Sequence, residues 1–183
     1  MYWLVGIVAV VVVVLIWVVL TYNRLVRVRN KSEEAWSGID VQLQRRADLV
    51  PNLVETVKGY AGHEREALEA VTEARNAITR AAGPRAAGEA DEQLEGALRQ
   101  LFAVAEAYPD LKASTNFLQL QRDLAMLEEE ISFSRRYYNA VVEDLNTSIQ
   151  TFPSVLVARP LGFSEREYFK AGADDRAVPE VNL

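Results

Sequence analysis

The sequence contains no cysteine and a single histidine, His63. Without cysteine, the chain has no disulfide, no thiolate metal site, no cysteine nucleophile and no lipid-modified cysteine anchor. Glu64 follows His63, but Ala67 stands where a zinc-protease H-E-x-x-H helix needs its second histidine. Tyr60 stands where a di-iron Glu-x-x-His pair needs its glutamate. We therefore predict no metal or other cofactor, and a solvated or capping role for His63.

Glycine-rich phosphate loops and an excess of basic residues are also absent. The glycines form neither G-x-x-x-x-G-K nor G-x-G-x-x-G, so the chain has no recognisable nucleotide-binding loop. The formal net charge is −6 at pH 7, whereas a nucleic-acid partner needs a basic face. The acidic run from Glu128 to Glu130 is typical of a solvated helix face. We predict that the protein is not an enzyme and binds no nucleic acid.

The chain does contain a long uncharged apolar run, from Tyr2 to Leu20. As a helix that rises about 1.5 Å per residue, Trp3 to Tyr22 covers roughly 28 Å, close to the roughly 30 Å hydrocarbon thickness of a bilayer. The aromatic residues at its two ends suit the membrane interfaces. We predict that residues 1–21 are a transmembrane anchor and that the lipid bilayer is a partner through Tyr2 to Leu20.

A cleaved signal peptide is the alternative interpretation of this run. Such peptides begin with a basic region and end at an A-x-A-like site, and the sequence has neither. We therefore expect a retained signal-anchor. Arg24, Arg27, Arg29 and Lys31 follow the run, while the other flank has only the amino terminus. The positive-inside rule then predicts a single-pass cell-membrane protein with its N-terminus outside and its remaining residues in the cytoplasm.

Beyond the anchor the pattern is helical, with no comparable strand alternation before Phe152. Neither glycine nor proline occurs between Gly6 and Gly38, so we expect the membrane helix to continue past the bilayer. One apolar stripe then recurs at three- and four-residue steps, at Trp36, Ile39, Leu43, Val50, Leu53, Val57 and Tyr60. Pro51 interrupts it, which predicts a kink or a helix boundary near residues 47–52, with Asp48 as a candidate N-cap.

Further helices are predicted over residues 52–82, from Glu89 or Asp91 onward after a loop at residues 83–88, and from Phe117 to Phe152. Each carries one apolar stripe that must be buried against another helix. The pattern therefore predicts an all-α fold with coiled-coil-like packing. We divide the chain into the anchor, a helical bundle over residues 22–152, and an extended strap with a mobile tail over residues 153–183. We expect the apolar residues of the strap to pack back on the bundle and the tail to begin at Gly172; these apolar residues are Val155, Leu156, Val157, Leu161, Phe163, Tyr168 and Phe169.

The least ordinary polar residues lie around Pro51. Arg46 occupies a position of the apolar stripe, so it either snorkels to solvent or pairs with a buried carboxylate. The candidate interaction or structural polar cluster consists of Trp36, Asp40, Arg45, Arg46, Asp48, Pro51 and Asn52. A catalytic or ligand-binding role would require these side chains to converge in one pocket.

Three segments carry a likeness to a known family. They read YNRLVRVRNKSEEAWSGIDVQLQRRADLVPNLVETVKGYAGHE at residues 22–64, YPDLKASTNFLQLQRDL at 108–124 and RRYYNAVVEDLNTSIQTFPSVLVARPLGF at 135–163. These segments resemble the LemA family of bacterial membrane proteins. The resemblance implies an N-terminal transmembrane helix followed by an antiparallel four-helix bundle, with a boundary or strong kink at Pro51. It implies no catalytic residues, and it suggests a membrane metalloprotease as a candidate partner.

Our leading hypothesis is a membrane-anchored helical bundle that acts by protein–protein interaction, as a scaffold or regulator at the cytoplasmic membrane face. The alternative is an enzyme or small-ligand binder that uses the polar cluster from Asp40 to Asn52. A structural spacer, or an oligomer built through the helical seams, is a third hypothesis. The sequence does not identify the protein partner.

Overall fold

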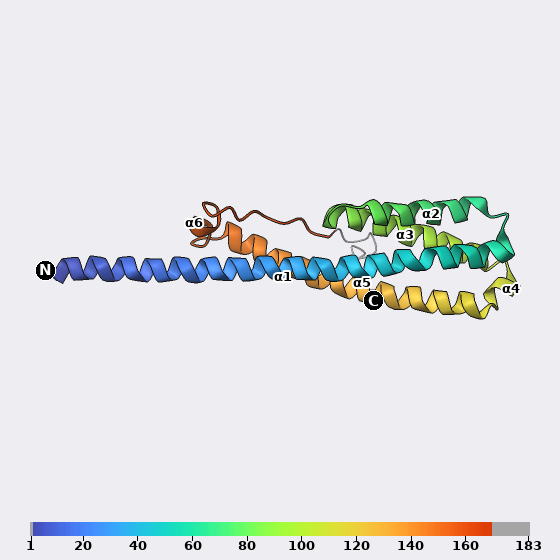
Figure 1. Cartoon of the computed structure of the whole chain (residues 1–183), viewed down its shortest axis with the longest axis horizontal. Helices are drawn as coiled ribbons and strands as arrows, with labels where there is room; N and C mark the ends of the chain where they lie inside the picture. The colour runs from blue at the N-terminus through green and yellow to red at the C-terminus, as the bar shows by residue number, and fades with distance from the viewer. Residues whose placement is uncertain (1, 170–183) are drawn as a thin grey trace, which may run out of the picture. The chain divides into compact units, whose positions relative to one another are not determined.

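The computed structural model describes residues 2–169 of the 183-residue chain. These residues form six α-helices, and no strand occurs among them (Figure 1). The helices are α1 (Tyr2–Ala61), α2 (Arg65–Arg80), α3 (Pro84–Ala105), α4 (Pro109–Lys112), α5 (Thr115–Gln150) and α6 (Val155–Ala158). The predicted all-α fold class is confirmed.

Helix α1 begins with the apolar run predicted to span a membrane. An 18-residue window near its N-terminus has a mean hydropathy of 3.2, and none of that window is buried. The helix is therefore long and apolar enough to cross a bilayer. It also continues past Leu20 without a break, as the lack of glycine and proline between Gly6 and Gly38 predicted.

The sequence predicted a kink or a helix boundary near residues 47–52. Pro51 lies inside α1, which excludes the boundary, and Asp48 is an interior helical residue and not an N-cap. Proline has no N–H to donate to the carbonyl of Ala47, four residues earlier. Instead, Arg75 of α2 donates its Nε–H to the Ala47 oxygen at 3.4 Å. A side chain from a neighbouring helix thus satisfies the carbonyl that proline leaves without its helical partner.

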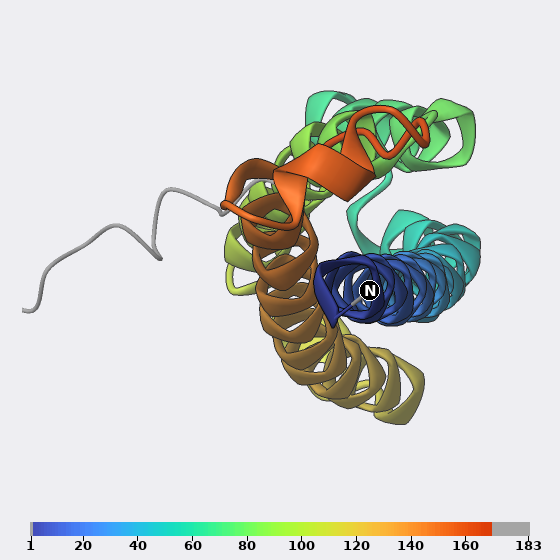
Figure 2. The ribbon, with the colours of Figure 1, turned by 90° about the vertical axis from the view of Figure 1, so that its left-hand side faces the viewer.

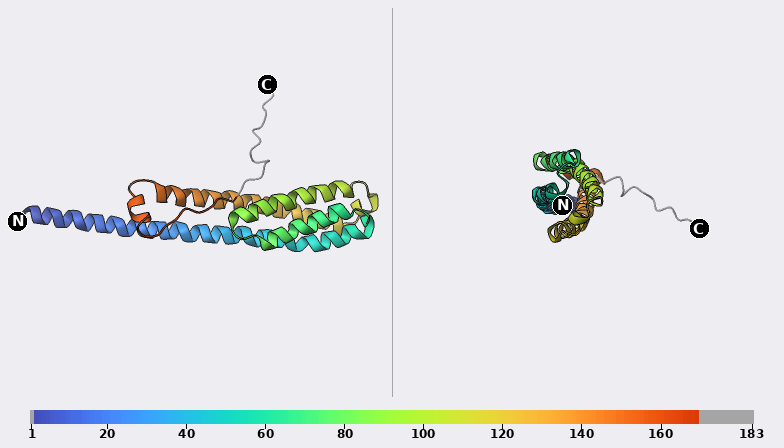
Figure 3. Two further views of the ribbon diagram at one scale, coloured as in Figure 1. Left: turned by 90° about the horizontal axis from the view of Figure 1, so that it is seen from above. Right: turned by 90° about the vertical axis from the view of Figure 1, so that its right-hand side faces the viewer.

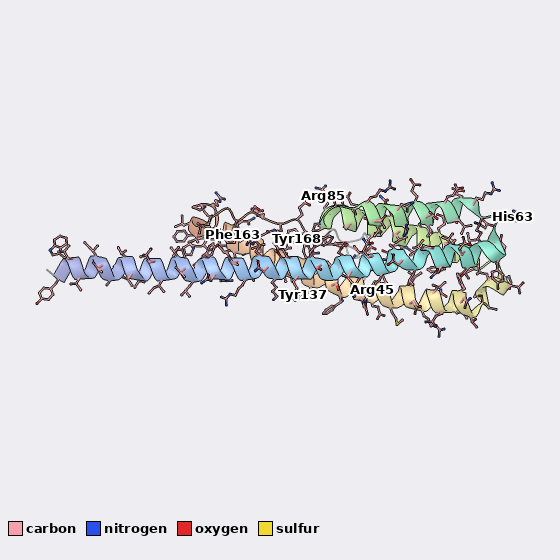
Figure 4. All side chains as sticks on the ribbon, in the orientation of Figure 1. Arg45, His63, Arg85, Tyr137, Phe163 and Tyr168 are labelled. Atoms are coloured by element: carbon pink, nitrogen blue, oxygen red, sulfur yellow. The ribbon has the colours of Figure 1, made fainter. Side chains whose placement is uncertain are left out.

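The break that ends α1 falls at residues 62–64, inside the stretch 52–82 that the sequence predicted to be one helix. A Cβ added at Gly62 would lie 3.0 Å from the backbone oxygen of Lys58, so a side chain at this position would be crowded. His63 is exposed in this turn (Figure 4). The turn connects α1 to α2 with a very short loop.

Helix α3 begins at Pro84, which is earlier than the predicted start at Glu89 or Asp91. Proline suits the first turn of a helix because the N–H that it lacks would have no partner there. Gly83 precedes it with φ of 87°, a backbone conformation that glycine adopts at little cost. Proline therefore starts this helix, whereas the sequence analysis read it as part of the loop.

The chain divides into two compact units, and the first comprises Met1–Trp36 and Tyr137–Glu167. Its core is formed by Leu25 of α1, Leu145 and Ile149 of α5, Ala158 of α6, and Phe163. Figures 2 and 3 show α6 beyond the end of α5 and beside α1. Residues far apart in the sequence thus share one small apolar core.

A glycine turn after α6 directs Phe163 into this core. The Phe163 N–H donates to the Ala158 oxygen at 3.0 Å, and the Gly162 N–H donates to the Arg159 oxygen at 3.2 Å. Gly162 has φ of 75°, so this pair of hydrogen bonds forms a Schellman motif with glycine at its left-handed position. The Phe163 ring then lies edge-on to Tyr22, with centroids 5.8 Å apart.

The segment after this turn is held to α5 and α1 by polar contacts. Asn146 donates to the Arg166 oxygen at 2.9 Å and accepts from the Arg166 N–H at 2.8 Å. The Tyr138 hydroxyl donates to the Glu167 oxygen at 2.8 Å, and the Arg166 guanidinium pairs with Glu33 at 2.5 Å. These contacts order residues 166–167 along the two helices.

The predicted strap packs back only in part. Val157 and Phe163 are buried, but Leu156 and Leu161 are exposed, although all four were expected to pack against the helices. The strap also contains the short helix α6. The predicted mobile tail from Gly172 to Leu183 lies outside the described residues.

The second unit contains α2, α3 and α4 together with residues 37–61 of α1 and 115–136 of α5. The predicted apolar stripe of α2 is buried at Leu68, Val71, Ala74 and Ile78. Helices α2 and α3 pack directly side by side (Figures 1 and 2). At the turns, the Tyr108 hydroxyl donates to Glu64 at 2.9 Å, which ties the segment before α4 to the start of α2.

Replacing Arg75 with methionine should lower the free energy of unfolding by about 1 kcal/mol, because the Ala47 carbonyl loses its donor. The loss should shrink in a Pro51→Ala background, where alanine supplies the N–H of the helix. Thermal unfolding of the detergent-solubilised protein, followed by circular dichroism, measures this coupling. Arg80→Met is the matched control. Arg80 donates a hydrogen bond to the Asn76 oxygen within α2, so this substitution should cost the same in both backgrounds. Equal losses for Arg75→Met in both backgrounds would remove the proposed compensation.

Candidate functional site

The residues of the predicted polar cluster do not converge. Arg46 is buried, whereas Asp40, Arg45, Asp48, Pro51 and Asn52 are exposed along α1. Trp36, in the first unit, is half-buried and its ring lies 6.0 Å from that of Tyr138. Arg45 and Asp48 line an open groove from which Arg46 points away. The cluster therefore does not provide the single pocket that a catalytic or ligand-binding role required.

Arg46 instead forms a buried ionic layer with two other helices. Its Nη1 donates to Asp91 Oδ1 of α3 at 2.9 Å. Glu128 Oε2 of α5 lies 2.7 Å from the same nitrogen, outside the alignment of a hydrogen bond. The side chains of Arg46 and Asp91 are 4% and 6% exposed. Of the two alternatives for Arg46, the structure thus contains the ion pair.

Burial dominates the protonation of Asp91. Loss of hydration raises the pKa of this carboxyl from 3.8 to about 6, although the Arg46 guanidinium lowers it, while Glu128 and Glu95 raise it further. Arg46 Nε finds no hydrogen-bond partner among the described residues. The ionic layer is therefore costly to bury, and it would disfavour any packing that leaves Arg46 without its carboxylates.

The sequence analysis missed both carboxylate partners. Asp91 stands three residues before Leu94 in the buried stripe of α3, so its position on the apolar face was a usable signal. Glu128 stands four residues after the buried Leu124, and it was assigned to a solvated face. Opposite charges on the apolar stripes of two helices can be predicted from the sequence to form a pair. Which stripes pack together, however, is decided by the tertiary structure.

A different part of the second unit forms an open groove between α1 and α5. Two adjoining hollows of about 440 and 390 Å³ share Met126 and Glu130. We call them together the α1/α5 groove. Its lining residues are Gln42, Arg45, Asp48 and Leu49 of α1, and Asp123, Met126, Leu127, Glu129, Glu130, Phe133 and Ser134 of α5 (Figure 4 labels Arg45).

The groove combines exposed apolar side chains with an acidic rim. Met126 is 56% and Phe133 67% exposed, which is unusual for large apolar residues on a helix surface that meets only water. Four carboxylates and one guanidinium line the groove. The surface therefore suits a partner that brings apolar anchors flanked by positive charge.

A second groove, of about 650 Å³, lies between α1 and α2. Lys58 and Arg65 line it together with Glu69 and Glu73, so its charges are mixed. Its apolar lining residues, Val54 and Leu68, are half-buried and buried. These two side chains are less exposed than Met126 and Phe133 of the α1/α5 groove.

Possible metal ligands are scattered over residues 2–169. Among them, no three histidine, aspartate or glutamate side chains are grouped so that they could hold a metal ion. The buried Arg46–Asp91 pair faces the helices around it and lines none of the grooves described above.

Comparison with known proteins places this chain near membrane-associated proteins of unestablished biochemical activity. The LemA family model matches residues 35–183. Protein LemA of Metamycoplasma hominis is 30% identical over 158 residues, 84% of this chain and 71% of that protein. Magnetosome protein MamQ 2 of Paramagnetospirillum magneticum is 26% identical, with 81% and 64% covered. Magnetosome protein MamQ of Magnetospirillum gryphiswaldense is 24% identical, with 87% and 70% covered. The chain thus spans about two thirds of the MamQ relatives' length.

Titration of Asp91 should make stability depend on pH. Because its pKa is higher in the folded protein, at about 6 against 3.8, the folded state binds this proton more tightly. The resulting stabilisation is present below about pH 4 and is lost as the pH rises through about 6, a change of about 3 kcal/mol. Asp91→Asn should remove this pH dependence. The free energy of unfolding of the native protein, relative to that of the variant, should therefore decrease as the pH rises from about 4 to about 6.

Chemical denaturation of the solubilised protein over this pH range gives the difference. Glu92→Gln, at an exposed position beside Asp91, controls for the loss of a carboxylate from α3. A pH-independent difference between the native protein and Asp91→Asn would contradict the assignment.

Proposed function

Because the chain belongs to the LemA family, we propose that it is a membrane-anchored helical bundle that binds other proteins at the membrane surface. It would act as a scaffold or regulator. The observation that carries this proposal is the exposed apolar surface that Met126 and Phe133 contribute to the α1/α5 groove. The names of the relatives do not denote an enzyme.

In the proposed architecture, residues 37–61 of α1 form an antiparallel four-helix bundle with α2, α3 and the first part of α5. Short loops at residues 62–64 and 81–83 support antiparallel neighbours, because they leave no length for a crossover. Buried stripes on the helices supply the core. The ionic layer of Arg46, Asp91 and Glu128 would link three of the four helices and favour one register.

The proposed partner contributes an amphipathic helix to the α1/α5 groove. A groove between two helices with exposed apolar residues suits this mode of recognition, in which anchors recur every three or four residues. The acidic rim selects a helix with lysine or arginine beside those anchors. A membrane metalloprotease remains a candidate partner, to be judged by whether it presents such a helix near the membrane.

We also propose that the N-terminus lies outside the cell and the bundle in the cytoplasm. The cations that follow the apolar run support this orientation. Because the chain lacks cysteine, single cysteines can be introduced at Tyr2 and at the exposed Gln100 of α3. In intact cells, a membrane-impermeant maleimide should label the cysteine at position 2, and the cysteine at position 100 only after lysis. The reverse pattern would invert the proposed topology.

Contact at the groove can be tested by placing a photoreactive phenylalanine analogue at position 133 of the full-length protein in its native membrane. Irradiation should yield a discrete crosslinked protein. Met126→Ser should weaken this complex by on the order of 2 kcal/mol, roughly 30-fold in affinity, because an apolar anchor loses its contact. The control places the same analogue at Tyr60, which is 49% exposed but does not line the groove. Equal crosslinking from both positions, unaffected by Met126→Ser, would argue against the groove.

A further inference from the structure

Three large apolar side chains are exposed at the end of the first unit. Phe152, Leu156 and Leu161 are 80%, 61% and 52% exposed. Leu156 belongs to α6 and the other two residues lie before and after this helix, so we call residues 152–161 the apolar tip. The α1/α5 groove is made by other residues, so the tip needs an explanation of its own.

The tip carries almost no charge. From Leu145 to Ser164 the sequence contains one charged residue, Arg159, and no carboxylate. A surface turn in water usually carries polar and charged residues, whereas a segment in a membrane interface combines apolar side chains with arginine or lysine. The composition of the tip matches the second environment.

The tip lies beside the end of the apolar run of α1. Phe152, Pro153 and Ser154 line a hollow of about 300 Å³ together with Trp17 and Thr21. Trp17 is about 4.5 Å along the helix from Leu20, the last residue of the run. If α1 spans a bilayer, this contact places the tip at the depth where α1 leaves the hydrocarbon.

Internal contacts hold the tip in this position. Ser154 Oγ donates to the Ser148 oxygen at 2.7 Å and lies 3.0 Å from the Thr151 oxygen. On the other side, Ala158 and Phe163 are buried against Leu25 of α1. Leu156 therefore stays exposed while its neighbours are anchored, and no apolar surface within the unit covers it.

We propose that the apolar tip is a second membrane contact, with Phe152 and Leu156 inserted at the boundary between headgroups and acyl chains. This inference rests on the proposed membrane anchor. Arg24 lines the same hollow and pairs with Asp144 at 3.5 Å, so the exposed Arg159 on the tip is the cation placed to meet a lipid phosphate. Two contacts on one unit would also restrict the rotation of α1 about its own axis, which a lone spanning helix leaves free.

The test uses full-length protein reconstituted in vesicles of phosphatidylcholine and phosphatidylglycerol. The native chain has no cysteine, so a single environment-sensitive fluorophore can be attached to Leu156→Cys. Val10→Cys, inside the apolar run, is the reference for a probe within the hydrocarbon of the bilayer. Glu143→Cys is the aqueous control, since Glu143 is exposed on α5 roughly 10 Å along the helix before its last residue, Gln150. Lipids with brominated acyl chains then quench only probes that reach the hydrocarbon boundary.

The proposal expects quenching at positions 10 and 156 and none at position 143. Quenching at position 10 without quenching at 156 overturns the tip contact and leaves the anchor intact. An apolar emission spectrum at 156 without lipid quenching means that a protein or a second copy covers the tip, which also overturns it. Absence of quenching at both positions refutes the membrane anchor and, with it, the tip.

Discussion

The apolar run at the start of α1 needs an apolar solvent, and the arrangement of the first unit follows from that need. Its interior backbone polar groups are satisfied within the helix, as lipid requires, and after Tyr2 and Trp3 the large side chains that it exposes are aliphatic. At its end the environment must change. There α5, α6 and Phe163 gather around Leu25 and begin the water-compatible part of the protein with a small core.

The second unit depends on a different balance, between apolar stripes and the charges set within them. Helices α1 and α3 each place an ionisable residue where their stripes would otherwise be apolar, and these two residues meet as Arg46 and Asp91. Burying either charge alone would be strongly unfavourable. The pair therefore adds little net stability, but it penalises arrangements in which the stripes pack out of register.

Sequence reasoning succeeded where a structure follows from local periodicity. The long stripe from Phe117 onward predicted a helix of the length of α5, and the stripe of α2 is buried as expected. It could not choose between a kink and a boundary at Pro51, because the fate of the Ala47 carbonyl depends on Arg75, 28 residues away. It considered Asp91 only as a possible start of a helix, because a carboxylate gives no sign of burial until the arginine opposite it is known. Leu156 and Leu161 were expected to pack against the helices. Their hydrophobicity predicts contact with an apolar environment but does not indicate whether protein or lipid provides it.

The sequence by itself determined that the protein is helical, that its first helix is suited to a membrane and that it lacks cysteine chemistry. These properties depend on side-chain type and short-range spacing, which act within a single helix. Only the tertiary structure decided which charges pair, which apolar residues remain exposed and where the grooves lie. Those outcomes depend on contacts between segments distant in the chain, whose energies are set by burial and not by local periodicity.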